Sequence, residues 1–414
     1  MISSARNVDV LFLIEHEDRE GGVVNRMQEE LNKYGVSSAK MSINFHLHLL
    51  TKVRTKLIVV PYAISSSEGL TALIYTNKSV RTGKIKVLSL NWEQYLSKAN
   101  YAFKKPQDSI IKNMVYHVAW DQNYKLFLEN NGVKESNIKI TGNPSHQVLV
   151  DLTCNYTVSQ VKQKIGLPRN FKKTIFLPMN YGWAFMSDEV INYKVSRGYQ
   201  RDVALTYRDY TRSCIRSFCH FIDDASSTDV DTLFVIRPHP SISVEQYYDV
   251  FEKEAPGVKD RNNVIVSKDF SIREWIFVSD YVGSSWSTSI IDAIILDKEV
   301  FLYTPEKRPE FLDVEWNNLV PNISSYSDIK NIKGNQLEKM LVKKDVYKNL
   351  FDFINEIIQD SDLSDFKFEI SKFNLVVYSK TYIKSFLMKI FSGYGVDKGQ
   401  QRDYFDENNC FQEK

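Results

Sequence analysis

The chain has 414 residues, of which 43% are hydrophobic and 25% are charged. This length favours two or three domains, and the composition is typical of a soluble globular enzyme. With 53 basic and 51 acidic residues the formal net charge is only +2, which excludes a global electrostatic attraction to nucleic acid.

The cysteines and the hydropathy indicate the compartment. The four cysteines form neither a C-x-x-C pair nor the regularly spaced set of a disulfide framework, which favours a reduced cytosolic protein. These cysteines are Cys154, Cys214, Cys219 and Cys410. The first residues do not form a secretory signal, and no apolar run approaches the ~20 residues of a membrane-spanning helix. We therefore expect a cytoplasmic protein that at most touches the inner face of the plasma membrane.

Short apolar runs alternate with helical patterns over residues 1–150. Strands are expected at residues 8–14, 56–62, 85–93, 116–121 and 138–144, with a helix at 122–131. Strands separated by helices at this spacing predict a Rossmann-like domain. Glu15 opens a dense charged loop after the first strand. This loop is interpreted equally well as part of a site or as a solvated helix start.

A second Rossmann-like domain is predicted over residues 173–350, after a helical linker at residues 151–172. Its first strand, at residues 173–181, runs into a polar turn that contains Asn180. Residues 183–202 have no clean period and are interpreted as a long loop over the cleft, and a helix is expected at about residues 204–222. Neither half contains a Gly-x-Gly-x-x-Gly fingerprint or a phosphate loop ending in Lys-Ser/Thr, which argues against a dehydrogenase and an NTPase.

Two loops of the second half have complementary chemistry. An apolar strand at 233–237 stops at Pro238-His239-Pro240, where Arg237 and His239 can present donors and positive charge. A later strand runs into hydroxyl side chains at a predicted helix start: Ser284, Ser285, Ser287 and Thr288. Hydroxyls and unpaired amides at a helix start favour an anion, most often phosphate. Either loop alone is better interpreted as a satisfied histidine or ordinary N-caps, but two such loops in one sheet favour a phosphate site.

These motifs resemble bacterial glycosyltransferases of the GT-B architecture, most closely the group called surface carbohydrate biosynthesis proteins, which build capsule and O-antigen polysaccharides. Further segments match landmarks of that group in the same order: residues 12–20, 91–94, 140–144 and 176–181. The resemblance covers residues 8–305. It implies an α/β fold in which two Rossmann-like domains face each other across a cleft. The donor nucleotide would lie mainly on the second domain and the acceptor on the first.

The His-Pro pair and the Ser/Thr cluster are also similar to those of bacterial sialyltransferases and Kdo transferases. That similarity implies that the histidine and the hydroxyls hold the phosphate of a CMP-activated 2-keto sugar acid. The full donor-binding set expected from the motifs is Arg237, His239, Pro240, Ser284, Ser285, Ser287, Thr288, Asn143 and Asn180.

The catalytic base is harder to assign. The acidic-acidic-glycine motif of sialyltransferases is absent, and Asn91-Trp92-Glu93 is its nearest counterpart. We nominate Glu93 as the base for the acceptor hydroxyl, with Glu15 as the competitor. Glu93 can also be interpreted as a surface carboxylate at a helix start. No Asp-x-Asp stands at a strand end suited to a divalent metal, so we expect no metal and no cofactor besides the nucleotide-sugar donor.

Three alternatives share this fold: a CDP-glycerol or CDP-ribitol polyol-phosphate transferase of the teichoic-acid type, a nucleotide-sugar 2-epimerase, and a non-catalytic assembly protein. The expected acceptor is an oligosaccharide or a lipid-linked glycan. Residues 351–414 are predicted to form helices and a polar tail. Within them, residues 383–391 mix apolar and basic side chains. Packing of this helix on the core is the favoured interpretation, and peripheral membrane contact is the alternative.

Overall fold

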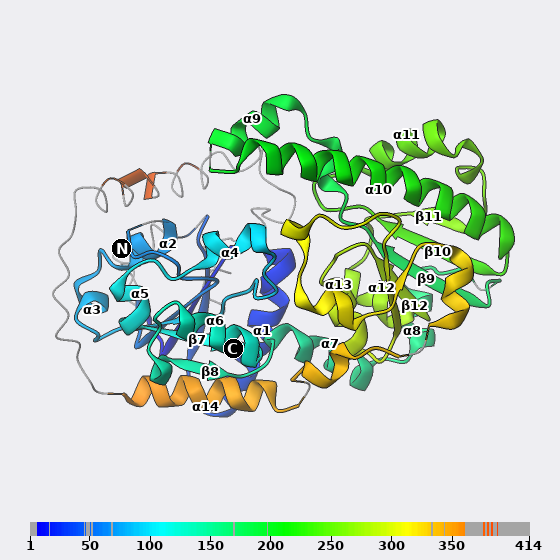
Figure 1. Cartoon of the computed structure of the whole chain (residues 1–414). Coiled ribbons are helices and arrows are strands. Elements are labelled where there is room, and N and C mark those ends of the chain that lie inside the picture. Colours follow the sequence, from blue (N-terminus) through cyan, green and yellow to red (C-terminus); the bar gives the residue numbers. More distant parts are fainter. Residues whose placement is uncertain are drawn as a thin grey trace. The chain divides into compact units, whose positions relative to one another are not determined.

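The computed structural model describes residues 6–360 except residues 16, 45, 47–49, 51–52, 68, 169, 197, 333 and 343, and also residues 376, 379, 380, 382, 383 and 387. Contacts within the chain divide it into two compact units, whose elements Figure 1 labels. The first unit comprises residues 1–94, 101–148 and 341–414, and the second comprises residues 95–100 and 149–340.

A parallel six-stranded sheet in the order β3-β2-β5-β6-β7-β8 forms the centre of the first unit. Its strands are β2 (Val10–Ile14), β3 (Ser38–Ser42), β5 (Leu57–Val60), β6 (Lys86–Ser89), β7 (Val115–Ala119) and β8 (Ile138–Ile140). Its helical segments include η1 (Glu17–Gly21), α1 (Gly22–Lys33), α2 (Gly69–Ile74), α3 (Lys78–Arg81), α5 (Ser109–Met114), α6 (Gln122–Asn130), η3 (Glu135–Asn137) and α14 (Val346–Gln359). The short strands β1 (Arg6–Asn7) and β4 (Val53–Arg54) pair with each other.

Continuous apolar runs explain the central strands of this sheet. All five residues of β2 are buried, as is usual for a parallel strand covered on both faces. Helix α14 belongs to this unit although it follows the second unit in sequence. Asp360, just after α14, accepts hydrogen bonds from the Tyr116 hydroxyl at 2.5 Å and from Lys86 Nζ at 3.1 Å. The predicted domain boundary at residue 350 therefore falls inside a helix that completes the first unit.

The second unit contains a parallel six-stranded sheet in the order β11-β10-β9-β12-β13-β14. Its strands are β9 (Lys173–Pro178), β10 (Thr232–Arg237), β11 (Val264–Val266), β12 (Tyr281–Ser284), β13 (Glu299–Tyr303) and β14 (Asn322–Ile323). Its helices are α8 (Val158–Lys164), α9 (Asp188–Ser196), α10 (Arg201–Thr228), α11 (Val244–Glu254), α12 (Ile272–Val278) and α13 (Ser289–Ile295). Short 3₁₀ turns join them: η4 (Gly182–Phe185), η5 (Pro256–Val258), η6 (Glu310–Leu312), η7 (Glu315–Leu319), η8 (Tyr326–Asn331) and η9 (Leu337–Met340). Helices α4 (Lys98–Lys104) and α7 (Pro144–Asn155) contribute residues to both units.

The strand order of each sheet reverses beside its first strand. In the first unit β2 has β3 on one side and β5 on the other, and in the second unit β9 lies between β10 and β12. In open parallel sheets, ligands bind outside the carboxyl ends of the strands at such a switch point. The topology therefore predicts ligand sites at the loops that follow β2 and β5, and at those that follow β9, β10 and β12.

Several local predictions needed correction. Residues 183–202 are not a long loop, because η4 and α9 occupy most of them, and α10 extends beyond the predicted 204–222 at both ends. The expected linker at residues 151–172 contains the end of α7 and all of α8, and it belongs to the second unit. The predicted helix at residues 383–391 lies mostly outside the described residues.

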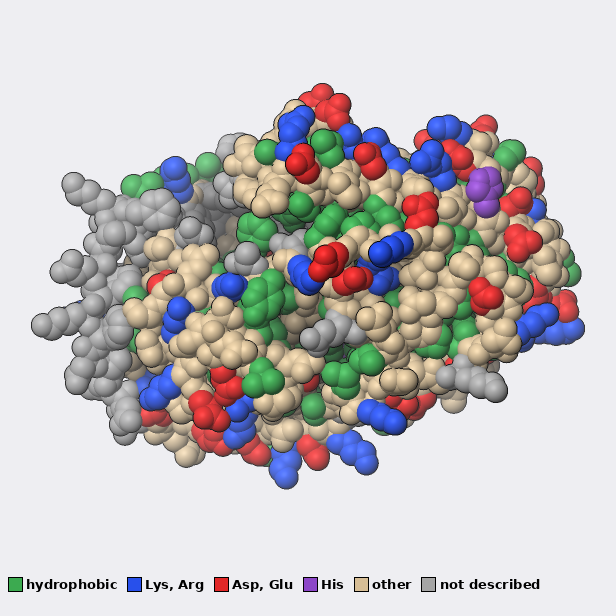
Figure 2. Space-filling model, in the orientation of Figure 1, with side chains coloured by type: hydrophobic (Ala, Val, Ile, Leu, Met, Phe, Trp, Pro, Cys, Tyr) green, Lys and Arg blue, Asp and Glu red, His purple; other side chains and the backbone are tan. Residues whose placement is uncertain are grey.

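Charge is mixed over the helices of the second unit. On the face that Figure 2 shows, Lys and Arg side chains alternate with Asp and Glu side chains over α9, α10 and α11. Such mixing agrees with the small net charge of +2 and gives no single-sign field on this face.

Candidate functional site

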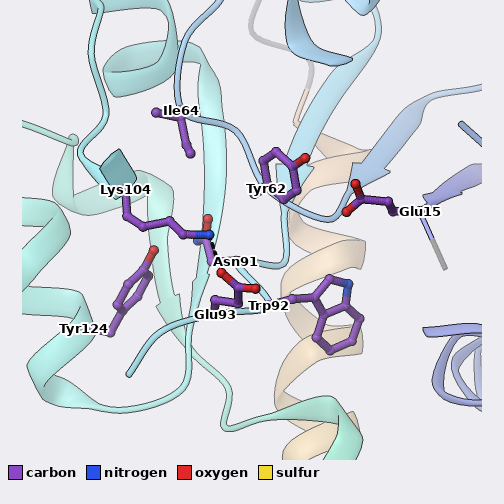
Figure 3. A pocket seen from close by; sticks show the side chains of 8 residues that line it. All are labelled: Glu15, Tyr62, Ile64, Asn91, Trp92, Glu93, Lys104 and Tyr124. Carbon is purple, nitrogen blue, oxygen red and sulfur yellow. Dashed lines mark hydrogen bonds and ion pairs between the residues drawn. The ribbon is translucent and has the colours of Figure 1, made fainter. Parts of the chain in front are cut away.

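A cavity lies at the switch point of the first unit, beside the carboxyl ends of β2, β5 and β6 (Figure 3). Its volume is ≈ 320 Å³, and its lining residues are Glu15, Tyr62, Ile64, Asn91, Trp92, Glu93, Lys104 and Tyr124. Both carboxylates nominated as base therefore line one pocket. Sequence reasoning missed Lys104, Tyr62 and Tyr124. Only Tyr62 had a usable signal, because it follows the end of β5 as Glu15 follows β2.

Glu93 carries an ion pair inside this pocket. Lys104 Nζ lies 2.6 Å from Glu93 Oε2, and the Glu93 side chain is 60% exposed. The same ammonium lies 5.6 Å from the centre of the Tyr62 ring. Figure 3 shows the lysine extending towards Glu93, with the rings of Tyr62 and Tyr124 on either side. The pocket thus combines aromatic surfaces with a carboxylate and a cation, which is the mixture of apolar walls and a few charged groups typical of a small-molecule site.

The turn that presents Trp92 and Glu93 is fixed from below. Asn91 is buried and has a left-handed backbone, with φ at 51°. Its side-chain oxygen accepts a hydrogen bond from the Ser89 hydroxyl at 2.7 Å, and its amide nitrogen donates to the Val118 carbonyl at 3.1 Å. Asparagine adopts this conformation more readily than most non-glycine residues, and these two hydrogen bonds hold it there.

His117 lies under this turn on β7. Its Nε2–H donates to the Ile111 carbonyl at 3.1 Å, and its Nδ1 lies 3.4 Å from the amide nitrogen of Asn91. Burial lowers the pKa of His117 to about 4, so the imidazole is neutral at pH 7. This tautomer lets Nδ1 accept from Asn91, which ties the turn to the core.

The charged loop after β2 is held by its own carboxylates. The Glu20 side chain is buried and accepts a hydrogen bond from the Glu15 backbone N–H at 2.8 Å. Glu17 Oε1 accepts from Lys40 Nζ at 2.6 Å. These contacts fix the backbone at Glu15, whose side chain lines the pocket. They favour a loop whose backbone is held in place by hydrogen bonds over the alternative of a solvated helix start.

In the second unit, the predicted basic loop stands at the end of β10. Arg237 Nη1 donates to the Asp269 carbonyl at 3.0 Å. His239 Nδ1 accepts from the Ser241 backbone N–H at 3.2 Å and lies 2.8 Å from the Ser241 hydroxyl. Burial and the nearby Lys268 lower the pKa of His239. The ring is therefore neutral at pH 7 with its proton on Nε2. Lys268 also donates to the Pro240 carbonyl at 2.7 Å, which fixes this loop.

The loop after β9 connects the two predicted phosphate loops. A Cβ at Gly182 would lie 3.2 Å from His239 Nδ1, so glycine permits the close approach of this loop to the histidine. On the other side, the Tyr181 hydroxyl lies 2.7 Å from the Ser285 hydroxyl. Because β9 separates β10 from β12, the two loops are next-nearest rather than adjacent in the sheet, and residues 180–182 bridge them.

The four predicted hydroxyls differ in their surroundings. Ser284 is buried and donates to the Pro178 carbonyl at 2.6 Å, and Ser285 is buried against Tyr181. The Ser287 hydroxyl lies 2.9 Å from the Ser289 hydroxyl. Thr288 is exposed and is the N-cap residue of α13, with no hydrogen bond from its side chain to the helix. Ser284 and Ser285 thus shape the turn, whereas Ser287 and Thr288 lie closer to solvent.

The two predicted asparagines lie in different units. Asn180 follows β9, and its Oδ1 is buried without a hydrogen-bond partner among the described residues. A buried, unpartnered acceptor between two donor-rich loops is available to a ligand. Asn143 lies in the first unit at the start of α7, where its Oδ1 accepts from the Ser145 backbone N–H at 3.0 Å. The other donor-binding candidates belong to the second unit.

Neither a metal cluster nor a spanning helix is found in the described part of the chain. No group of three or more His, Cys, Asp and Glu residues there could hold a metal ion. No helix there is long and apolar enough to cross a membrane.

Comparisons with known proteins identify the fold. No protein-family model matches the chain, and no curated protein matches it in sequence. Among solved structures, the wall teichoic acid polymerase TagF is similar with a TM-score of 0.51 at 12% identity, over 85% of this chain and 89% of that one. A UDP-GlcNAc 2-epimerase from Neisseria meningitidis bound to UDP-GlcNAc gives 0.52 at 12% identity, over 84% and 100%. A protein from Listeria monocytogenes described as a UDP-N-acetylglucosamine 2-epimerase gives 0.55 at 10% identity, over 87% and 100%. The chain therefore has the predicted GT-B fold class, with two Rossmann-like α/β halves.

Proposed function

We propose that the chain is a glycosyltransferase of bacterial surface polysaccharide biosynthesis that uses a nucleotide-activated sugar. The favoured donor is a CMP-activated 2-keto sugar acid such as Kdo or a sialic-acid-like sugar. One observation carries the proposal: the loop with Arg237 and His239 and the Ser/Thr turn lie at the carboxyl edge of one sheet, joined by residues 180–182 at its switch point. That position is where α/β sheets bind nucleotides.

The chemistry required of this edge is stabilisation of the departing phosphate. His239 carries its proton on Nε2, so it can donate a hydrogen bond to a phosphate oxygen while Nδ1 stays bound to Ser241. Arg237 supplies positive charge at the same strand end. Thr288 and Ser287 offer hydroxyls from the turn after β12. These donors stabilise a leaving nucleotide by hydrogen bonds and charge, and we expect no obligatory metal.

The acceptor would occupy the pocket of the first unit. Glu93 is our candidate base, and Glu15 is the competing one in the same pocket. The ammonium of Lys104 pairs with Oε2 of Glu93, so an acceptor hydroxyl that approaches this oxygen would share it with the ammonium. An oligosaccharide or a lipid-linked glycan presents such hydroxyls. We place this reaction in the cytoplasm, at the inner face of the plasma membrane.

Thermal-shift screening against CMP, CDP, UDP, GDP and ADP tests the donor site. A ligand at a hundred times its dissociation constant stabilises a protein by about 2.7 kcal/mol. We expect CMP to stabilise the wild type, and His239→Ala to lose that stabilisation. His220→Ala, which removes an exposed histidine from α10, is the matched control. A response to CDP alone would favour the polyol-phosphate transferase, UDP would favour the epimerase, and no response to any nucleotide would contradict the proposal.

A further inference from the structure

Arg308 is an almost completely buried cation beside the Ser/Thr turn. It follows β13, and its side chain is only 8% exposed. Its Nη2 donates to the Ser285 carbonyl at 3.0 Å. Its Nη1 donates at 2.8 Å to the side-chain oxygen of buried Asn317, in the amide orientation that satisfies both groups. Its Nε is buried and has no hydrogen-bond partner among the described residues.

The charge of this guanidinium is only weakly compensated. The one carboxylate in ion-pair range within the described part of the chain is that of Asp313, whose Oδ1 lies 3.6 Å from Nη1 and whose side chain is 52% exposed. Another carboxylate in the same loop, that of Glu306, accepts a hydrogen bond from the Ser213 hydroxyl. A buried cation with one long, solvent-screened ion pair is costly, and an additional anion nearby would offset that cost.

The hydrogen bond from Arg308 to the Ser285 carbonyl puts the guanidinium beside the Ser/Thr turn, where an anion bound to the turn would be close to it. Ser285 is held on two sides, through its hydroxyl by Tyr181 and through its carbonyl by Arg308. Ser284 is held by the Pro178 carbonyl. These hydrogen bonds hold the turn in place, and the Arg308 guanidinium is bonded directly to its backbone at the Ser285 carbonyl. No other part of this edge offers a cation so deeply buried with so little counter-charge among the groups described here.

We infer that Arg308 is a positioning residue of the second unit's anion site: it fixes the turn at Ser285 and supplies the buried counter-charge for a phosphate or diphosphate group bound there. The identity of that anion as the donor's phosphate rests on the proposed function. Arg308 was not among the residues that sequence motifs identified, because it stands in an irregular loop after β13.

Calorimetric titration with inorganic pyrophosphate, CMP and cytidine tests this inference, since the three probes differ in phosphate charge. Arg308→Gln should weaken pyrophosphate and CMP by about tenfold, the effect of one charge acting through protein near a surface. Cytidine binding should stay unchanged. Arg216→Gln, which removes an exposed arginine from α10, is the control for net charge and should alter none of the three.

A second variant acts in the opposite direction and keeps the test decisive if Arg308→Gln fails to fold. Asp313→Asn removes the one carboxylate that lies in ion-pair range of Arg308 among the described residues, and it leaves Arg308 in place; the Asp313 side chain is half exposed. It should tighten pyrophosphate and CMP by about threefold, because a partly screened carboxylate contributes modestly. Unchanged phosphate affinity in both variants, or an equal loss for cytidine and CMP in Arg308→Gln, would overturn the inference.

The proposed function and this inference fail in different ways. If wild type binds pyrophosphate but no nucleotide, the proposed donor is wrong, while the two variants still decide the role of Arg308. If wild type binds CMP and both variants leave its affinity unchanged, the donor proposal stands and the role of Arg308 is refuted. If wild type binds none of these anions, both are refuted.

Discussion

Acid should destabilise the first unit through His117. This histidine is buried beneath the pocket turn, and burial lowers its pKa to about 4 from an ordinary value of 6.5. The unfolded chain therefore binds a proton at a pH where the folded unit does not. The stability that neutral His117 contributes is fully present above pH 6.5 and is lost as the pH falls from 6.5 towards 4.

The size of this effect follows from the two pKa values. The fall of the His117 pKa from 6.5 to about 4 is equivalent to roughly 3 kcal/mol of differential stability. Because the folded histidine is half protonated at pH 4, about 3 kcal/mol is lost between pH 7 and pH 4. That is a large fraction of the stability of an ordinary domain.

A variant without a titrating group isolates this contribution. His117→Gln keeps a hydrogen-bonding side chain but cannot be protonated in this range. Hydrogen-exchange mass spectrometry of peptides that span β6 and β7, corrected for the intrinsic exchange rate, reports the free energy of opening of the first unit. The stability advantage of wild type over the variant should shrink by about 3 kcal/mol between pH 7 and pH 4. A difference that stays constant with pH would refute the reasoning.

Two further predictions concern catalysis and packing. Glu93→Gln should lower the rate of sugar transfer by about 10²- to 10⁴-fold, as loss of a catalytic base does. The melting temperature should not change, because the Glu93 side chain is 60% exposed. If Glu93→Gln is as active as wild type and Glu15→Gln is inactive, the base is Glu15. Gly283→Ala should destabilise the second unit by about 1–3 kcal/mol in urea denaturation, because the added Cβ would collide with the Phe301 ring. Gly257→Ala is the matched control and should stay within about 0.5 kcal/mol, because a Cβ there would lie 3.9 Å from the flexible end of the Arg261 side chain.

The elements that could be predicted from the sequence are those with a strong local pattern. The apolar runs of β2 and β10 indicate strands that are buried on both faces. Gly132, with φ at 87°, follows the end of α6 at the position where a helix stop was predicted. The edge strand β3, with the sequence SAKMS, was missed because its alternation of small and polar residues does not resemble a buried strand. Its pairing with β2 provides the stability that its own composition does not.

The candidate sites could be predicted only in part, because their assembly depends on strand order. Glu15 and Glu93 are distant in sequence, and they meet in one pocket because β2, β5 and β6 are neighbours. Likewise, no local signal places β9 between β10 and β12, so the bridging position of Tyr181 was not foreseen. Lys104 and Arg308 stand outside any motif, and only the folded chain brings them to Glu93 and Ser285.

Transfer itself tests the central claim most directly. The purified chain would be incubated with CMP-activated Kdo or CMP-activated sialic acid, and release of CMP would be measured with and without a glycan acceptor. We expect acceptor-dependent release by wild type and by His220→Ala, and a loss of at least about 100-fold in His239→Ala, the size of effect seen when one donor to a developing charge is removed. Release from CDP-glycerol but from neither CMP-sugar, or equal release by wild type and His239→Ala, would contradict the account.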